Sequence, residues 1–326
     1  MLELTVISPV LLWTAIAIYA ASFVAYAFDL ARRSQATADA KTVREGELVG
    51  VGARGGAPAV TATGAAADPA PQRFVMARIG TSLTILAWVF HLAAAVTRSI
   101  AAGRVPWANL YEFAMIGTLL IVLVYLVVLT RIDLRYLGTF ITGLVVVLLG
   151  LAATNFYVAV TPLMDPLKSI WLIIHVFVAS LATAFFALAF ALSVIQLMQA
   201  RRERLVREEV AKTGPGFLRT LPGSDRLESL AYRFTIIGFI LWTFTLIAGS
   251  IWAQDAWGRY WGFDVKETWT FVIWVVYAGY IHARATRGWR GNPSAWLSIV
   301  GFASVMFNFT IVNVFFKGLH AYSGLS

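Results

Sequence analysis

Eight mostly apolar stretches, most of them about 20 residues long, dominate the 326-residue chain. A helix of about 20 apolar residues is long enough to cross a bilayer. With 59% hydrophobic and 13% charged residues and a mean hydropathy of +0.75, the chain lies outside the soluble range. We therefore predict an all-α polytopic membrane protein with about eight transmembrane helices, at residues 4–28, 74–97, 111–130, 136–153, 169–198, 229–251, 267–285 and 294–316.

Basic residues lie mainly in alternate loops between these helices. Loops 29–78, 131–135, 199–233 and 283–293 contain 20 of the 26 Lys and Arg residues, and the other six are Arg98, Arg104, Lys168, Arg259, Lys266 and Lys317. Because cytoplasmic loops are enriched in Lys and Arg, we expect a multi-pass protein of the cytoplasmic membrane with both termini on the extracytoplasmic side. This asymmetry explains the net charge of +9 without nucleic acid as a partner.

The composition divides the chain into three expected domains. Residues 1–33 should form a retained transmembrane helix, because the basic residues that precede the apolar core of a signal peptide are lacking. Residues 34–73 are rich in Ala, Gly, Thr and Pro, a composition that cannot bury enough apolar surface to order itself, and are predicted to be a flexible cytoplasmic linker. Residues 74–326 contain the remaining helices.

Two features of the loop 199–233 are predicted to be structural. RRERLVREEV, at 201–210, should extend the fifth helix beyond the membrane as a salt-bridged turn or two. Asp225 and Glu228 resemble an N-cap and capping-box pair at the start of the sixth helix.

The stretch from Trp252 to His282 combines many aromatic side chains with fixed charges. Its first part, residues 252–266, is expected to be an external loop between helices six and seven. The residues predicted to face a ligand are Trp252, Trp257, Arg259, Tyr260, Trp261, Asp264 and Lys266, followed by Glu267. If the loop is helical, the i, i+3, i+4, i+7 spacing from Trp257 to Asp264 places four of them on one face. Aromatic surface beside cations suits a large, planar, negatively charged ligand, whereas tryptophans that only anchor helices at the membrane interface are the alternative.

The chain has no cysteine, so histidine is the metal ligand that we expect, and there are four histidines. His175, near the outer end of helix five, and His320, beyond helix eight, are both expected outside. Two imidazoles at one level beside an aromatic loop could supply both axial ligands of a haem iron, with Arg259 and Lys266 as candidates for its propionates. Histidines that only hydrogen-bond between helices are the alternative.

The other two histidines are predicted at separate places. His282 follows Glu267 by 15 residues, about 22 Å of helix, and so lies deep in the membrane towards the cytoplasm. Polar residues at such depth are costly and usually face a partner or a cavity. His91, near the outer end of helix two, is expected to pack or to form hydrogen bonds.

Several segments resemble one family. WAQDAWGRYWGFDVKETWTFVIWVVYAGYIHAR, at 252–284, resembles the tryptophan-rich "WWD" signature of haem-handling proteins, and its flanks resemble the CcsA (ResC) family of system II cytochrome c biogenesis. GRVPWANLYEF at 103–113, SIWLIIH at 169–175 and VNVFFKGLHAYSG near the end are similar to that family too. The resemblance covers about residue 80 to the end. One departure is Trp261-Gly262-Phe263-Asp264, where the family pattern usually has a Trp-Asp pair.

The resemblance implies a role for each matching residue. His175 and His320 would be the external axial ligands of haem b, whose iron would be the metal bound, and residues 252–266 would hold the porphyrin. His282 would bind haem inside the membrane, with a second ligand from a separate partner protein, CcsB (ResB). Residues 74–326 would thus be a CcsA-like haem-handling domain.

Four residues of the 103–113 segment are expected to form an external turn and helix start. They either only begin the helix or also line a vestibule for haem or substrate, and they are Pro106, Asn109, Tyr111 and Glu112.

The function that the resemblance implies is haem transport across the membrane with CcsB. The chain would present reduced haem to the Cys-x-x-Cys-His motif of apocytochrome c for thioether formation, as a subunit of a cytochrome c synthase (haem lyase) complex. Other, thiol-reducing proteins would keep the cysteines of the apocytochrome reduced. Two alternatives stay open: an exporter of another planar anionic molecule, and a b-type electron-transfer subunit.

Overall fold

The computed structural model describes residues 2–52, 75–160, 168–210, 214–286, 288–316 and 318–319. All regular structure within these ranges is helical. The α-helices are α1 (Leu2–Gly52), α2 (Val75–Ala102), α3 (Leu110–Leu129), α4 (Gly138–Asn155), α5 (Ile170–Arg207), α6 (Ser224–Trp257), α7 (Val265–Ala285), α8 (Asn292–Phe307) and α9 (Asn313–Phe315). Two 3-10 segments, η1 (Arg135–Leu137) and η3 (Gly216–Thr220), and the π-helical turn η4 (Asn308–Val312) complete the described helices.

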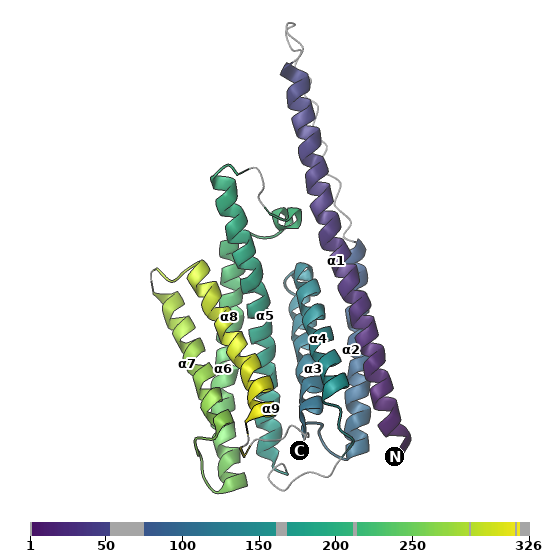
Figure 1. The fold of residues 1–326 in the computed structure, drawn as a ribbon, viewed down its shortest axis with the longest axis vertical. Helices are drawn as coiled ribbons and strands as arrows, with labels where there is room; N and C mark the ends of the chain where they lie inside the picture. The colour runs from purple at the N-terminus through teal and green to yellow at the C-terminus, as the bar shows by residue number, and fades with distance from the viewer. Residues whose placement is uncertain are drawn as a thin grey trace.

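Seven spans of the described chain are helical, long and apolar enough to cross a membrane, from α1 to α6 and from α8 through α9. Helix α7 has 21 residues, but Lys266 and Glu267 at its start and Arg284 near its end shorten its apolar stretch. It lies alongside α6 and α8 in the bundle (Figure 1). The predicted all-α polytopic membrane fold is therefore confirmed, with seven to eight spanning helices.

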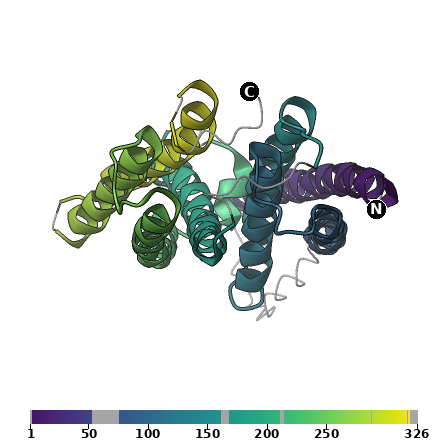
Figure 2. The same ribbon diagram turned by 90° about the horizontal axis from the view of Figure 1, so that it is seen from below.

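The helices run alternately up and down in two groups (Figure 1). Helices α1 to α4 pack together in one group and α5 to α8 in the other, and α3 packs on α5 to join the groups (Figure 2). The start of α1 and helix α9 lie at the same end of the bundle, together with the loop between α6 and α7 (Figure 1). Which side of the membrane this end faces stays a prediction.

Three helix boundaries bear on the sequence predictions. Helix α1 continues to Gly52, into the first part of the segment predicted as a linker, while residues 53–74 lie outside the described part of the chain. A helix that is already nucleated gains a hydrogen bond with each added residue, which favours such extension. Helix α5 runs on to Arg207, as RRERLVREEV predicts, and α6 runs on to Trp257. The three-domain division stays a prediction.

Glu228 does not cap α6, contrary to the prediction. The N-cap of α6 is Gly223, without a side-chain hydrogen bond. Glu228 is buried and lies 2.5 Å from Arg284, and it accepts a 3.0 Å hydrogen bond from the backbone N–H of Gly291. A buried carboxylate needs such partners, and here α7 and the residue before α8 supply them.

Aromatic packing fixes α5, α6 and α7 against one another. The rings of Phe186 and Tyr277 stack with centroids 3.7 Å apart. A Cβ at Gly238 would lie 2.7 Å from the Phe186 ring, so glycine permits the close approach of α6 to α5. The indole N–H of Trp242 donates to the carbonyl of Thr270 at 3.1 Å and links α6 to α7. These contacts position the walls of the pocket described next.

Candidate functional site

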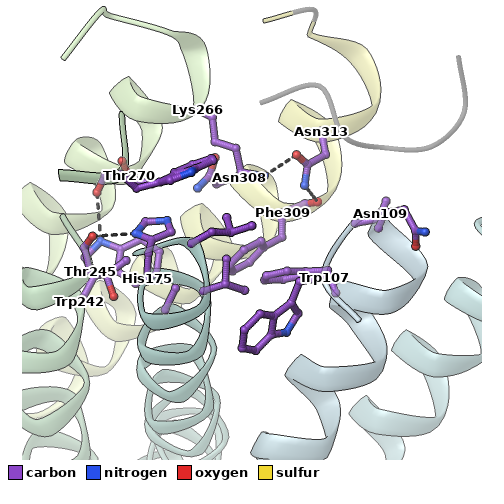
Figure 3. A pocket seen from close by; sticks show the side chains of 16 residues that line it. Trp107, Asn109, His175, Trp242, Thr245, Lys266, Thr270, Asn308, Phe309 and Asn313 are labelled. Carbon is purple, nitrogen blue, oxygen red and sulfur yellow. Dashed lines mark hydrogen bonds between the residues drawn. The ribbon is translucent and has the colours of Figure 1, made fainter. Parts of the chain in front are cut away.

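A pocket of about 750 Å³, including its open mouth, lies where the two helix groups meet, at the end that contains the α6–α7 loop (Figure 3). Aromatic side chains form much of its wall, namely Trp107, Phe113, Trp242, Trp252 and Phe309. The polar residues that line it are Asn109, His175, Thr245, Lys266, Thr270, Asn308 and Asn313. We call it the His175 pocket.

His175 lies near the start of α5, whose N-cap is Ser169. Its Nδ1 is 2.9 Å from the carbonyl oxygen of Thr245 on α6. Because a carbonyl only accepts, Nδ1–H is the donor, and in the neutral imidazole Nε2 then has the lone pair that can bind a metal. The imidazole also stacks on Trp252, with centroids 5.9 Å apart and 28° between the ring planes. The orientation of the ring is therefore fixed from α6.

A second pocket, of about 480 Å³, adjoins the first on the side of the α6–α7 loop. Gly249, Tyr260, Trp261 and Glu267 line it. The two pockets share their border residues, which are His175, Thr245, Trp252, Lys266 and Thr270. The imidazole and the Trp252 indole thus border both spaces.

The α6–α7 loop is shorter than predicted and is not helical. Helix α6 ends at Trp257, and Gly258 caps it in the left-handed region with φ of 70°. Asp264 is the N-cap of α7 and forms a capping box with Glu267. The spacing from Trp257 to Asp264 would place four residues on one face only if the loop were helical, and that condition is not met, because the two caps leave residues 258–264 irregular.

Glu267 organises this loop. Its Oε2 accepts hydrogen bonds from the backbone N–H groups of Gly262, at 2.8 Å, and Asp264, at 3.1 Å, and lies 4.0 Å from the Arg259 guanidinium. Asp264 Oδ1 accepts a further bond from the backbone N–H of Leu319, at 3.2 Å. The loop is thereby tied to the chain segment that follows α9.

Three aromatic residues of the loop are exposed: Tyr260, Trp261 and Phe263. Phe263 is 82% exposed and has φ of 56°, an uncommon conformation for a residue other than glycine. This is the position at which the sequence departs from the family pattern. Trp257, in contrast, packs on Trp252 with centroids 4.9 Å apart and supports the pocket wall from behind.

The four residues predicted as a helix start or vestibule separate in the structure. Asn109 is the N-cap of α3, accepts a bond from the Glu112 backbone N–H, and lines the His175 pocket. Pro106 is buried, and Tyr111 borders a different pocket, between α1 and α4. Glu112 is fully buried and forms ion pairs with Arg98, at 2.9 Å, and Arg104, at 2.7 Å.

The remaining histidines lie apart from the pocket or outside the described residues. His282 is in the last turn of α7, at the opposite end of that helix from the α6–α7 loop, and its side chain is exposed. His320 lies outside the described residues. His91 is buried, with its Nδ1 3.5 Å from the Tyr19 hydroxyl and the two rings packed edge to face, which agrees with the expected packing role.

The structure adds residues that the sequence did not single out. These residues, each of which borders at least one of the two pockets, are Trp107, Thr245, Gly249, Asn308 and Asn313. Trp107 belongs to the GRVPWANLYEF segment, so an aromatic residue within a recognised motif was a usable signal. The other four lie in ordinary apolar helical sequence, which contains no signal that would mark them as pocket residues.

Comparison with known proteins places this site within a described family. Residues 107–320 match the family described as "Cytochrome C assembly protein". The chain is 34% identical over 264 residues to the cytochrome c biogenesis protein CcsA of Guillardia theta, an alignment that covers 76% of this chain and 86% of the relative. It is 33% identical over 250 residues to the CcsA of Prochlorococcus marinus, covering 70% and 78%.

The fold is similar to that of a solved haem lyase structure. The cytochrome c haem lyase CcmF superposes with a TM-score of 0.60 at 15% sequence identity, over 94% of this chain and 46% of that chain. The matched residues 107–320 include the pocket, the α6–α7 loop and His282. The chain therefore belongs to the CcsA family of cytochrome c assembly proteins.

Proposed function

We propose that this protein binds haem b in the His175 pocket and presents it to apocytochrome c for covalent attachment, acting with CcsB in system II cytochrome c biogenesis. One observation supports this most directly. His175 donates Nδ1–H to the Thr245 carbonyl, so the lone pair of its neutral imidazole is on Nε2, in a residue that lines both pockets. A metal-binding histidine usually donates its other ring N–H to a carboxylate, a backbone carbonyl or water.

The surroundings of His175 suit a porphyrin. Trp107, Trp252 and Phe309 offer apolar and aromatic walls, and Lys266 offers a cation for a propionate. Arg259, the other predicted cation, lines neither pocket and faces Glu267 instead, so we assign the propionate to Lys266.

His320 is proposed as the second axial ligand. The backbone N–H of Leu319, the residue before it, donates to Asp264, and Asp264 is the N-cap of α7, whose second residue is Lys266. Two imidazoles would complete the axial coordination of the iron. Haem held in this way would stay ligated until the Cys-x-x-Cys-His segment of an apocytochrome reaches its vinyl groups, to which the two thiols add as thioethers.

Tyr260 and Trp261 line the second pocket, and the exposed ring of Phe263 packs edge to face on Trp261, with centroids 6.3 Å apart. We propose that they form the edge over which the apocytochrome reaches the haem, on the extracytoplasmic side of the cytoplasmic membrane. An exposed aromatic cluster that merely anchors the loop at the membrane interface is the competing explanation.

His282 is proposed to receive haem first. Its side chain is exposed on the outside of α7, where a second ligand from CcsB could reach the same iron. About 27 Å of helix separates it from Asp264, so haem would be handed over between two levels of the membrane.

A complementation experiment tests this function. In cells that lack the chain, the wild-type protein should restore haem-stained cytochrome c, and His282→Ala should reduce it to background unless haem is supplied from outside. The matched control is Arg290→Ala, an exposed change in the nearby segment before α8, which should complement fully. Normal assembly by His282→Ala from internal haem alone would contradict the two-level route. Failure of the wild-type chain with CcsB present would contradict the function itself.

A further inference from the structure

Asn308 is a buried polar residue in the wall of the His175 pocket whose amide is not used by the protein. Its side chain is 1% exposed, and neither Oδ1 nor Nδ2 has a hydrogen-bond partner among the described residues. An unpaired buried amide costs folding free energy, and natural proteins rarely leave one without a reason. Because Asn308 lines the pocket, a ligand bound there can supply the missing hydrogen-bond partner of its amide.

The backbone at Asn308 is also unusual. Residues 308–312 form the π-helical turn η4 between α8 and α9. In an α-helix, two residues five apart lie about 140° apart around the axis, since each residue turns the helix by about 100°. In a π-helix, hydrogen bonds join residues five apart, which brings these residues to nearly the same side of the helix. The turn therefore lets Asn308 and Asn313 both line the pocket, together with Phe309.

Asn313 binds the one cation that lines the pocket among the described residues, the ammonium of Lys266. Its Oδ1 accepts a hydrogen bond from the Lys266 ammonium, and its Nδ2 donates to the Phe309 carbonyl at 2.8 Å. Figure 3 shows Lys266 and Asn313 reaching toward each other from two helices, with Asn308 beside them. An ammonium has three N–H donors, so Lys266 can bind an anion while it keeps its bond to Asn313.

We propose that Asn308 and Lys266 form a carboxylate-binding corner of the pocket, in which the Asn308 Nδ2–H group donates to a propionate of the bound porphyrin and the Lys266 ammonium neutralises its charge. This rests on the proposed function, since it names the part of the same ligand that the η4 turn recognises. Asn313 acts as a positioning residue that directs Lys266.

The test compares two porphyrins on the purified full-length protein. Ferric haem b and its dimethyl ester differ in the propionate charge and leave the iron and the ring unchanged. Asn308→Leu, which keeps the size of the side chain, should weaken haem b binding about tenfold or more and weaken binding of the ester less, because the ester carbonyl is only a neutral acceptor. The same variant should melt at a higher temperature than the wild type, because it removes an unpaired buried amide. Ser304→Ala, one turn earlier on α8 and outside the pocket lining, is the control and should change neither affinity.

The outcomes separate this inference from the proposed function. Wild-type protein that binds neither porphyrin would contradict the proposed function. Wild-type protein that binds haem b, with Asn308→Leu binding it equally well, would overturn the carboxylate corner alone. Equal weakening of both porphyrins would show that Asn308 only packs, and would overturn it as well. If Asn308→Leu does not fold, the near-isosteric Asn308→Asp decides: a second carboxylate beside the propionate should weaken haem b more than the ester, and equal effects would reject the inference.

Discussion

Replacing His175 with glycine is expected to lower the affinity of the purified protein for haem b by more than about 100-fold. Removing a partner that only orients a metal ligand already costs about 10–100-fold, so loss of the ligand itself should cost more. Adding free imidazole should restore much of the affinity, because the space left by the side chain lies between Trp252 and the Thr245 carbonyl. The measurement is a haem titration followed by absorption, with and without imidazole.

A second change moves the imidazole without removing it. A Cβ at Gly249 would lie 2.7 Å from Cε1 and 2.8 Å from Nδ1 of His175, so Gly249→Ala should displace the ring and weaken haem binding about tenfold, without rescue by imidazole. Gly279→Ala on α7 is the matched control, since nothing lies within 4 Å of its Cβ position. A His175→Gly protein with wild-type affinity would show that the iron is held elsewhere.

Glu112→Ala is expected to destabilise the protein by about 3–5 kcal/mol, the usual cost of removing one partner from a buried ion pair. The carboxylate is fully buried, and the change would leave Arg98, which is 1% exposed, without its anion. Arg104 would lose the same partner. Glu112 also accepts a 2.9 Å hydrogen bond from the Ala108 backbone N–H, so the segment that contains Trp107 should loosen at the same time. Unfolding in detergent, followed by circular dichroism, measures the loss.

An exposed pair provides the comparison. Asp133 and Arg135 lie 2.5 Å apart in the turn after α3, with side-chain exposures of 60% and 25%. Solvent screens such a pair, so Asp133→Ala should cost less than about 1 kcal/mol. Equal stability of the two variants would mean that the ion pairs around Glu112 do not hold α2 and α3 together.

Much of the fold follows from local sequence. The spans follow from hydrophobicity alone, since a bilayer sets the required length. The N-cap of α3 at Asn109 and the capping box of Asp264 and Glu267 also follow local rules, because each satisfies the backbone N–H groups of its own helix. The Asp264 box lies within the stretch whose aromatic residues and charges also indicate ligand binding.

Tertiary contacts decided the features that the sequence did not reveal. Glu228 matches a capping pattern in the sequence. In the fold it pairs instead with Arg284, far along the chain, because an ion pair stabilises a buried carboxylate more than a helix N-terminus does. Trp107 reaches the His175 pocket only because α3 packs on α5. The spacing of apolar residues does not reveal the π-helical turn at Asn308. Its polar residues look like the occasional polar residues of any transmembrane helix. Each of these three features depends on contacts with another part of the fold.

The most direct test of the account is the reduced absorption spectrum of the purified chain loaded with haem b. We expect a six-coordinate, low-spin b-type spectrum with two imidazole ligands, which is lost when His175 and His320 are both changed to alanine. The same bis-imidazole spectrum in the double variant would contradict the assignment of the pocket.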